Sequence, residues 1–221
     1  MKNIALISVT LNAVNPMTEY LSRIPDVHVM NYLDSYILEK VNREGHMTDD
    51  CMGRMTAMLA HACGDGADGI IITCTIFSGY VDYFQGMFSV PVVGADTAMM
   101  ELAGRQAGRT ALICTFDGTK DASAARLESF CKKSGKTYEI VPYVLSDAYD
   151  AAQRYQMEIH DEIIRKKAAE LDQDFDQIVL AQISMANAVK GMEMQHAKLY
   201  TSPSAAYETI LAEMEKRKGI L

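Results

Sequence analysis

Residues 69–75 read Gly-Ile-Ile-Ile-Thr-Cys-Thr, an apolar run that ends in a small polar cluster around Cys74. Residues 176–184 repeat this shape as Asp-Gln-Ile-Val-Leu-Ala-Gln-Ile-Ser, and Gln182 stands where the first stretch has its cysteine. A short run that is apolar at every position is typical of a strand buried on both faces of a parallel sheet. The two stretches therefore predict one such strand in each half of the chain.

The rest of the chain alternates short apolar runs with longer helical patterns. Besides residues 69–73 and 177–181, strands are expected at 3–10, 27–32, 91–94, 110–114, 138–143 and 199–201. Helices are expected at 17–23, 48–63, 76–84, 97–103, 123–133, 148–171, 187–195 and 204–216. Apolar strands that alternate with helices indicate parallel sheets covered on both faces, so the predicted fold class is α/β.

The strands of the two halves match in order and at nearly the same separation along the chain. Residues 5–7 read Ala-Leu-Ile, and so do residues 111–113. This match predicts an internal duplication, although a plain alternation of strands and helices imitates part of it. We expect two similar α/β lobes, residues 1–107 and 108–221, and leave open whether the C-terminal helix crosses to the first lobe.

Parallel α/β sheets bind ligands beyond the carboxyl ends of their strands. Cys74 and Gln182 both follow a predicted central strand, one in each lobe. The duplication therefore predicts that these two residues face each other across a cleft between the lobes.

Composition excludes several classes of protein. The chain has 221 residues and a formal net charge of −8, which argues against binding to nucleic acid. No apolar run is long enough to span a membrane and no signal peptide is apparent, so we expect a cytoplasmic protein. The five cysteines form no CxxC pair and no zinc-ligand spacing, which predicts free thiols and no metal site.

Four stretches of the chain resemble the aspartate/glutamate racemase superfamily, and the resemblance extends over nearly the whole chain: residues 72–75, 115–119, 179–182 and 201–203. That superfamily includes amino-acid and hydantoin racemases, maleate isomerase and arylmalonate decarboxylase, and its members need no cofactor. The resemblance maps Cys74 onto the first of two cleft-facing positions that are usually both cysteine. The second position falls on Gln182, which departs from the pattern.

This departure has a chemical consequence. Racemisation by proton transfer needs a base on one face of the carbon and an acid on the other, and a thiol serves in either role. The amide of Gln182 has no titratable proton, and the hydroxyl of Ser184 is a poor acid without assistance. Cys74 is predicted to be reactive, because it lies at a strand end before a helix N-terminus that would stabilise its thiolate. A buried packing thiol is the alternative.

Polar residues after the predicted strands suit a carboxylate. Backbone amides and hydroxyls in the loops after residue 9 and after residue 114 would cradle an anion, although ordinary turns have the same composition. The predicted substrate-binding residues are Thr10, Asn12, Thr75, Thr115, Gly118, Thr119, Gln182 and Ser184.

Three functions remain open from the sequence. The first is a cofactor-independent racemase or isomerase that acts next to the carboxylate or carbonyl of a small acid, with Cys74 as acid, base or nucleophile. The second is a one-thiol decarboxylase of the arylmalonate type, in which Cys74 protonates the enolate. The third is a small-molecule-binding protein that has lost catalysis. The resemblance also implies that a homodimer is a common assembly.

Overall fold

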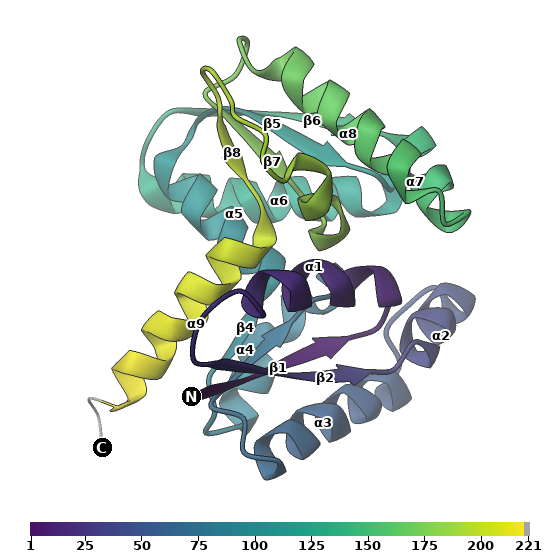
Figure 1. Cartoon of the computed structure of the whole chain (residues 1–221), viewed down its shortest axis with the longest axis vertical. Coiled ribbons are helices and arrows are strands. Elements are labelled where there is room, and N and C mark those ends of the chain that lie inside the picture. The colour runs from purple at the N-terminus through teal and green to yellow at the C-terminus, as the bar shows by residue number, and fades with distance from the viewer. Residues whose placement is uncertain (219–221) are drawn as a thin grey trace. The chain divides into compact units, whose positions relative to one another are not determined.

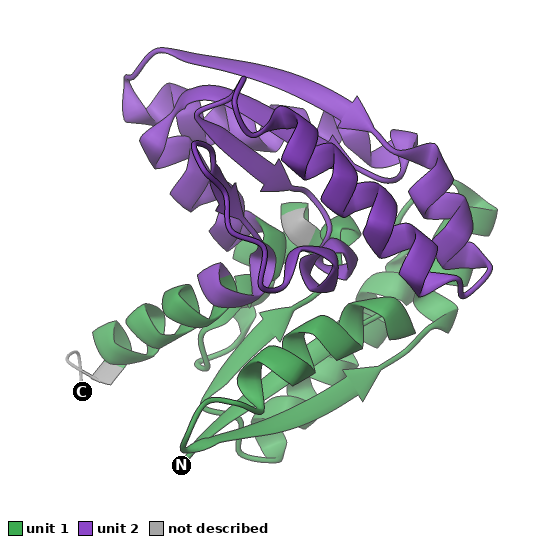
Figure 2. Cartoon of the chain, turned by 45° about the horizontal axis from the view of Figure 1, so that its top comes forward, with its two compact units in different colours: residues 1–96, 206–221 green, residues 97–205 purple. Residues whose placement is uncertain are grey.

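The computed structural model of the chain describes residues 1–218, except for the side chains of Ser78 and Lys218. The chain forms two compact units (Figure 2): Met1–Asp96 with the C-terminal segment from Ala206, and Thr97–Ala205. The sequence analysis divided the chain after residue 107. The structure divides it within helix α5 (Ala95–Gln106) and again within helix α9 (Ser202–Lys218), so the end of the chain belongs to the first unit.

The first unit is built on a four-stranded parallel sheet in the order β2-β1-β3-β4. Its strands are β1 (Lys2–Ser8), β2 (Val27–Leu33), β3 (Gly69–Ile72) and β4 (Val92–Gly94). Every residue of β3 is buried, because helices cover both faces of the sheet. In Figure 1, α1 lies over one face and α3 over the other.

The helices of the first unit differ from the expected ones in two places. They are α1 (Leu11–Leu21), α2 (Tyr36–Glu44), α3 (Asp49–Gly64), the 3₁₀ helix η1 (Thr75–Tyr80) and α4 (Val81–Met87). The expected start of the first helix at residue 17 was wrong, because the helix begins after Thr10 and contains Pro16. Helix α2 was not expected, since Ile37 is its only buried residue.

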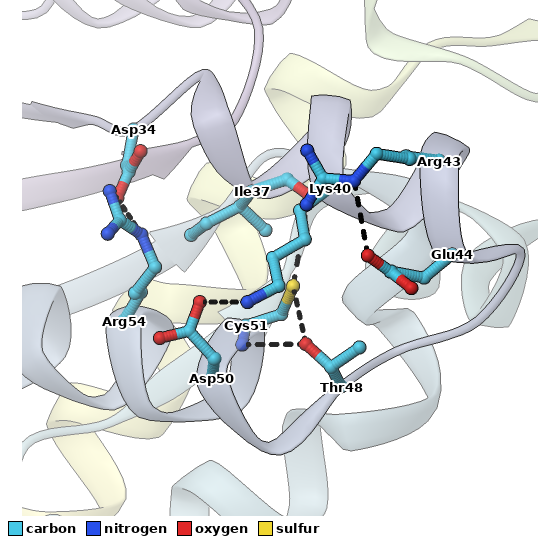
Figure 3. Close-up of polar contacts among 9 residues, drawn as sticks. All are labelled: Asp34, Ile37, Lys40, Arg43, Glu44, Thr48, Asp50, Cys51 and Arg54. Atoms are coloured by element: carbon cyan, nitrogen blue, oxygen red, sulfur yellow. Dashed lines mark hydrogen bonds and ion pairs between the residues drawn. The ribbon is translucent and has the colours of Figure 1, made fainter.

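Polar contacts join α2 to its neighbour α3 (Figure 3). Lys40 pairs with Asp50 at 2.7 Å, and Arg54 pairs with Asp34, just before α2, at 2.7 Å. Exposed ion pairs of this kind contribute little stability, usually about 0–1 kcal/mol each. Burial of Ile37 against the core therefore contributes more to the packing of this short helix.

Helix α9 covers the amino end of β3. A side chain at Gly69 would bring its Cβ to 2.7 Å from a side-chain carbon of Ile210 and 3.2 Å from the sulfur of Met214. Glycine at position 69 thus allows the last helix to pack directly on the strand.

The second unit has the same strand order, β6-β5-β7-β8, again fully parallel. Its strands are β5 (Gly108–Cys114), β6 (Tyr138–Val144), β7 (Gln177–Leu180) and β8 (Lys198–Tyr200). Its other elements are α6 (Asp117–Ser134), α7 (Ser146–Gln153), α8 (Met157–Leu171) and the 3₁₀ helix η2 (Ile183–Val189). The predicted α/β fold with two similar parallel sheets is confirmed.

Two predicted helices of the second unit were wrong. The single helix expected at 148–171 is two helices, since the chain turns between them at Tyr155, which has a positive φ of 59°. The helix expected at 187–195 is replaced by η2 and a loop. Asp172 holds this loop by accepting hydrogen bonds from the backbone amides of Gln195, His196 and Ala197 at 2.7, 3.1 and 2.8 Å.

Among the helices within residues 1–218, none combines the length and the apolar character that crossing a bilayer requires.

Candidate active site

Cys74 lies just beyond the carboxyl end of β3, where the sheet of the first unit ends. Strand β3 stops at Ile72, and Cys74 occupies the N-cap position of η1. The neighbouring Thr73 continues the pairing with β1: its amide donates to the Ile7 carbonyl at 3.0 Å, and its hydroxyl lies 2.8 Å from that of Ser8. The backbone on the strand side of Cys74 is therefore fixed by the sheet, and its side chain is half-buried.

The surroundings of the Cys74 thiol favour its protonated form. Burial raises the pKa of Cys74 to about 12; the backbone amide of Ile76 opposes this shift, and the carboxylate of Asp96 adds to it. The sequence analysis expected a helix N-terminus to stabilise the thiolate. That helix is a 3₁₀ segment of six residues, and desolvation outweighs the amide that it contributes.

Asp96 is a neighbour of Cys74 that the sequence analysis treated as a helix cap. It is buried in the first turn of α5, with 5% of its surface exposed. Its negative charge disfavours a second negative charge on the thiol. A carboxylate close to a thiol is not visible in the sequence, because strand β4 separates the two residues along the chain.

The other predicted residues of the first unit lie at the same edge of the sheet. Thr10 follows β1 and caps α1 by accepting a hydrogen bond from the Ala13 amide at 3.3 Å. Asn12 lies in the first turn of α1, and Thr75 opens η1; both are half-buried. Since β1 and β3 are paired, Thr10 and Asn12 belong to the same end of the sheet as Cys74.

Gln182 occupies the matching position in the second unit, beyond the carboxyl end of β7. Its Oε1 accepts hydrogen bonds from the backbone amide of Thr115 at 2.9 Å and from the Thr115 hydroxyl at 3.3 Å. Its Nε2 donates to the Thr119 hydroxyl at 3.0 Å, and that hydroxyl donates to the Phe116 carbonyl at 2.8 Å. The carboxamide of Gln182 thus holds the loop of residues 115–119, which leads into α6.

Two aromatic residues at this loop were not predicted. Phe116 is 46% exposed and stacks on Tyr149 with ring centroids 5.0 Å apart. A Cβ at Gly118 would approach the Phe116 ring to 2.5 Å, so the ring lies directly over this glycine. Ser184 lies in η2, two positions beyond Gln182, and is half-buried.

Cys114 is the thiol nearest to this end of the second sheet. It is fully buried at the end of β5, and burial raises its pKa to about 11, against the opposing effects of the Lys120 charge and a hydrogen bond with Ser123. Cys51 and Cys131 lie in the hydrophobic cores. In the part of the chain that the structure describes, no three His, Cys, Asp or Glu side chains are grouped so as to hold a metal ion.

Comparison with known proteins gives a family and a fold. The sequence profile of the family described as Asp/Glu/hydantoin racemase matches residues 20–208. No curated protein matches the chain.

Solved structures extend the match to the whole chain. The aspartate racemase of Picrophilus torridus has a TM-score of 0.71 at 12% identity, over 97% of this chain and 95% of its own. An aspartate racemase homologue from Pyrococcus horikoshii OT3 has a TM-score of 0.67 at 14% identity, over 97% of this chain and 100% of its own. A variant of arylmalonate decarboxylase in a sulfate-associated form has a TM-score of 0.53 at 15% identity, over 96% and 93% of the two chains.

Proposed function

Because the chain belongs to the Asp/Glu/hydantoin racemase family, we propose that it is a cofactor-independent isomerase-type enzyme that moves a proton at the carbon next to a carboxylate. The substrate class is a small acid, an amino acid or a derivative of one. The racemases that share the fold support this class.

Cys74 is the residue to which we assign the proton transfer. It lies at the carboxyl end of a central strand, the edge where parallel α/β sheets bind ligands. A thiol whose pKa is raised to about 12 is protonated at neutral pH and is ready to act as an acid. In the proposed step, the carbanion takes the proton from the thiol, and the resulting thiolate regains a proton from water.

The hydrogen bonding of Gln182 is the observation that carries the one-thiol mechanism. An amide has no titratable proton, and this one already binds Thr115 and Thr119 through both its oxygen and its nitrogen. The second unit therefore offers binding groups at this position rather than a second acid or base. We assign to its loop, residues 115–119, the binding of a carboxylate, since the first amides of a helix such as α6 lack acceptors within the helix.

Decarboxylation is the second candidate, and the pKa of Cys74 favours it. A protonated thiol cannot first remove a proton from a substrate, but it can deliver one. In that reaction the bond between the α-carbon and one carboxylate breaks, carbon dioxide leaves, and the electron pair forms an enolate. The enolate carbon then takes the proton of Cys74.

Exchange in D₂O tests both candidates. L-aspartate, L-glutamate and phenylmalonate are incubated separately with the protein, and ¹H NMR and chiral chromatography follow α-deuteration, inversion and loss of CO₂. We expect single-face exchange of an amino acid or decarboxylation of the malonate, each lost in Cys74→Ser and kept in Cys131→Ser, whose thiol lies in a hydrophobic core. Fast racemisation with full inversion would contradict the one-thiol mechanism. Activity that survives Cys74→Ser would contradict the role of Cys74.

A further inference from the structure

A pocket of about 330 Å³ lies at the amino ends of strands β5, β7 and β8, the end of the second sheet opposite to Gln182. All of its lining residues belong to the second unit. They are Gln106, Ala107, Gly108, Asp176, Gln177, Lys198 and Tyr200. Nothing in the proposed reaction uses this end of the sheet.

Gln177 has a carboxamide whose orientation is fixed. Its Nε2 lies 2.8 Å from the Ala107 carbonyl and 3.3 Å from the Ala103 carbonyl, and both are acceptors only. The nitrogen must therefore face these carbonyls, and Oε1 must face the other way. That oxygen is buried and has no hydrogen-bond partner among the described residues. The missing partner is a donor, an N–H or an O–H group.

Tyr200 presents a second unsatisfied group in the same pocket. Its hydroxyl is buried and also lacks a partner among the residues that the structure describes. The side chain is 7% exposed, and the ammonium of Lys198 lies 4.9 Å from the centre of its ring. A buried polar group without a partner costs about 1–3 kcal/mol, so two of them in one cavity indicate a bound polar molecule.

The charges around the pocket are of both signs. Lys198 supplies a cation, and Asp176 supplies a carboxylate whose Oδ2 accepts a hydrogen bond from the Arg109 amide at 2.7 Å. Gly108 allows this approach: its φ is +90°, and a Cβ there would lie 2.8 Å from the same oxygen. The carboxylate is thus held in place at the pocket by the backbone of β5.

We propose that this pocket binds a free α-amino acid. The ammonium group of the ligand would donate to Gln177 and pair with Asp176, and its carboxylate would accept from Tyr200 and pair with Lys198. A water molecule occupies about 30 Å³ in the liquid, so the pocket has room for a ligand of this size rather than for one bridging water. The site is independent of the proposed reaction.

Titration of ¹⁵N-labelled Cys74→Ser protein with glycine and L-alanine tests the proposal, since this background removes turnover. We expect saturable shifts of the Ala107, Gly108 and Gln177 amides. Glycolate, which lacks the amine, and methylammonium, which lacks the carboxylate, are expected to bind at least about tenfold more weakly. An absence of saturable shifts, with only an ordered water in a crystal structure, would overturn the proposal, as would equal binding of glycolate.

Two variants separate binding from structure. Lys198→Met is expected to weaken glycine binding about tenfold or more, while Lys190→Met, an exposed lysine outside the pocket, leaves it unchanged. Tyr200→Phe is expected to weaken binding and to leave the ligand-free Tm unchanged or raised, because it removes an unsatisfied hydroxyl. A lowered Tm with unchanged binding would show that the hydroxyl has only a structural role.

Discussion

Gln182 accepts a hydrogen bond from the backbone amide of Thr115 at 2.9 Å, across the paired ends of β7 and β5. This contact gives Gln182 a structural role within its own unit. The residue that replaces the second thiol of the family pattern fixes the entry to α6. The predicted meeting of Cys74 and Gln182 at one substrate stays a prediction.

Replacing Gln182 should destabilise the protein according to the acceptor that is lost. In Gln182→Leu the Thr115 amide loses its acceptor, and we expect a loss of about 1–3 kcal/mol in the free energy of unfolding. Gln182→Glu keeps an acceptor oxygen and should lose less. Urea denaturation of both variants measures the difference, and equal losses would show that the hydrogen bond to Thr115 does not matter.

Gln182→Cys tests the chemistry of the same position. The new thiol supplies a titratable proton, so the variant should gain or increase racemisation if the rest of the site is that of a racemase. It should also lose stability, since a thiol is a weaker acceptor than the carboxamide that it replaces. Chiral chromatography with L-aspartate and L-glutamate measures the first effect. Gln182→Ser, with a hydroxyl of similar size, is the matched control and should gain no racemisation.

The Cys74 thiol should react slowly with iodoacetamide at neutral pH. Its pKa is raised to about 12, so the thiolate fraction, and with it the rate, should still rise about tenfold per pH unit above pH 9. Peptide mass spectrometry follows the modification at this one residue. A rate that levels off near pH 8 would show an ordinary thiol pKa.

Asp96→Asn should make Cys74 more reactive. The Asp96 carboxylate raises the pKa of Cys74, so removing its charge lowers that pKa and increases the thiolate fraction at a given pH. The same alkylation assay at pH 8 measures the change. Asp82→Asn, at an exposed position in α4, is the control and should leave the rate unaltered.

Asp172 should make the second unit sensitive to acid. Three backbone amides donate to its carboxylate and lower its pKa in the folded state. Its contribution to stability is present above the unfolded pKa, about 3.9, and is lost as the pH falls through the lower folded value. Urea denaturation should therefore show a smaller loss of stability between pH 5 and pH 3 for Asp172→Asn than for Asp174→Asn, an exposed neighbour. Equal losses would assign the acid sensitivity to other groups.

The sequence predicted the parts of the fold that depend on continuous burial. Strands β3 and β7 are apolar at nearly every position, because both of their faces are covered. The start of α1 was missed, since Pro16 looked like the first residue of a helix, whereas the cap at Thr10 begins it earlier. The break between α7 and α8 was missed because Tyr155 adopts a positive φ that favours glycine.

The site was predictable only in part, for a related reason. The positions of Cys74 and Gln182 at strand ends follow from local pattern. The partners of Gln182 follow from the pairing of β5 with β7, and the effect of Asp96 on Cys74 from the pairing of β3 with β4. Such contacts join residues that are distant in the chain, and a single sequence does not specify them.

The packing of Ile210 on Gly69 has a consequence for synthesis on the ribosome. The first unit takes its last helix from the end of the chain, so the amino end of β3 stays uncovered until residue 214 has been made. The second unit, by contrast, is continuous from Thr97 to Ala205 and has all of its residues available earlier. We therefore expect the second half of the protein to complete its folding first, although translation begins with the other half.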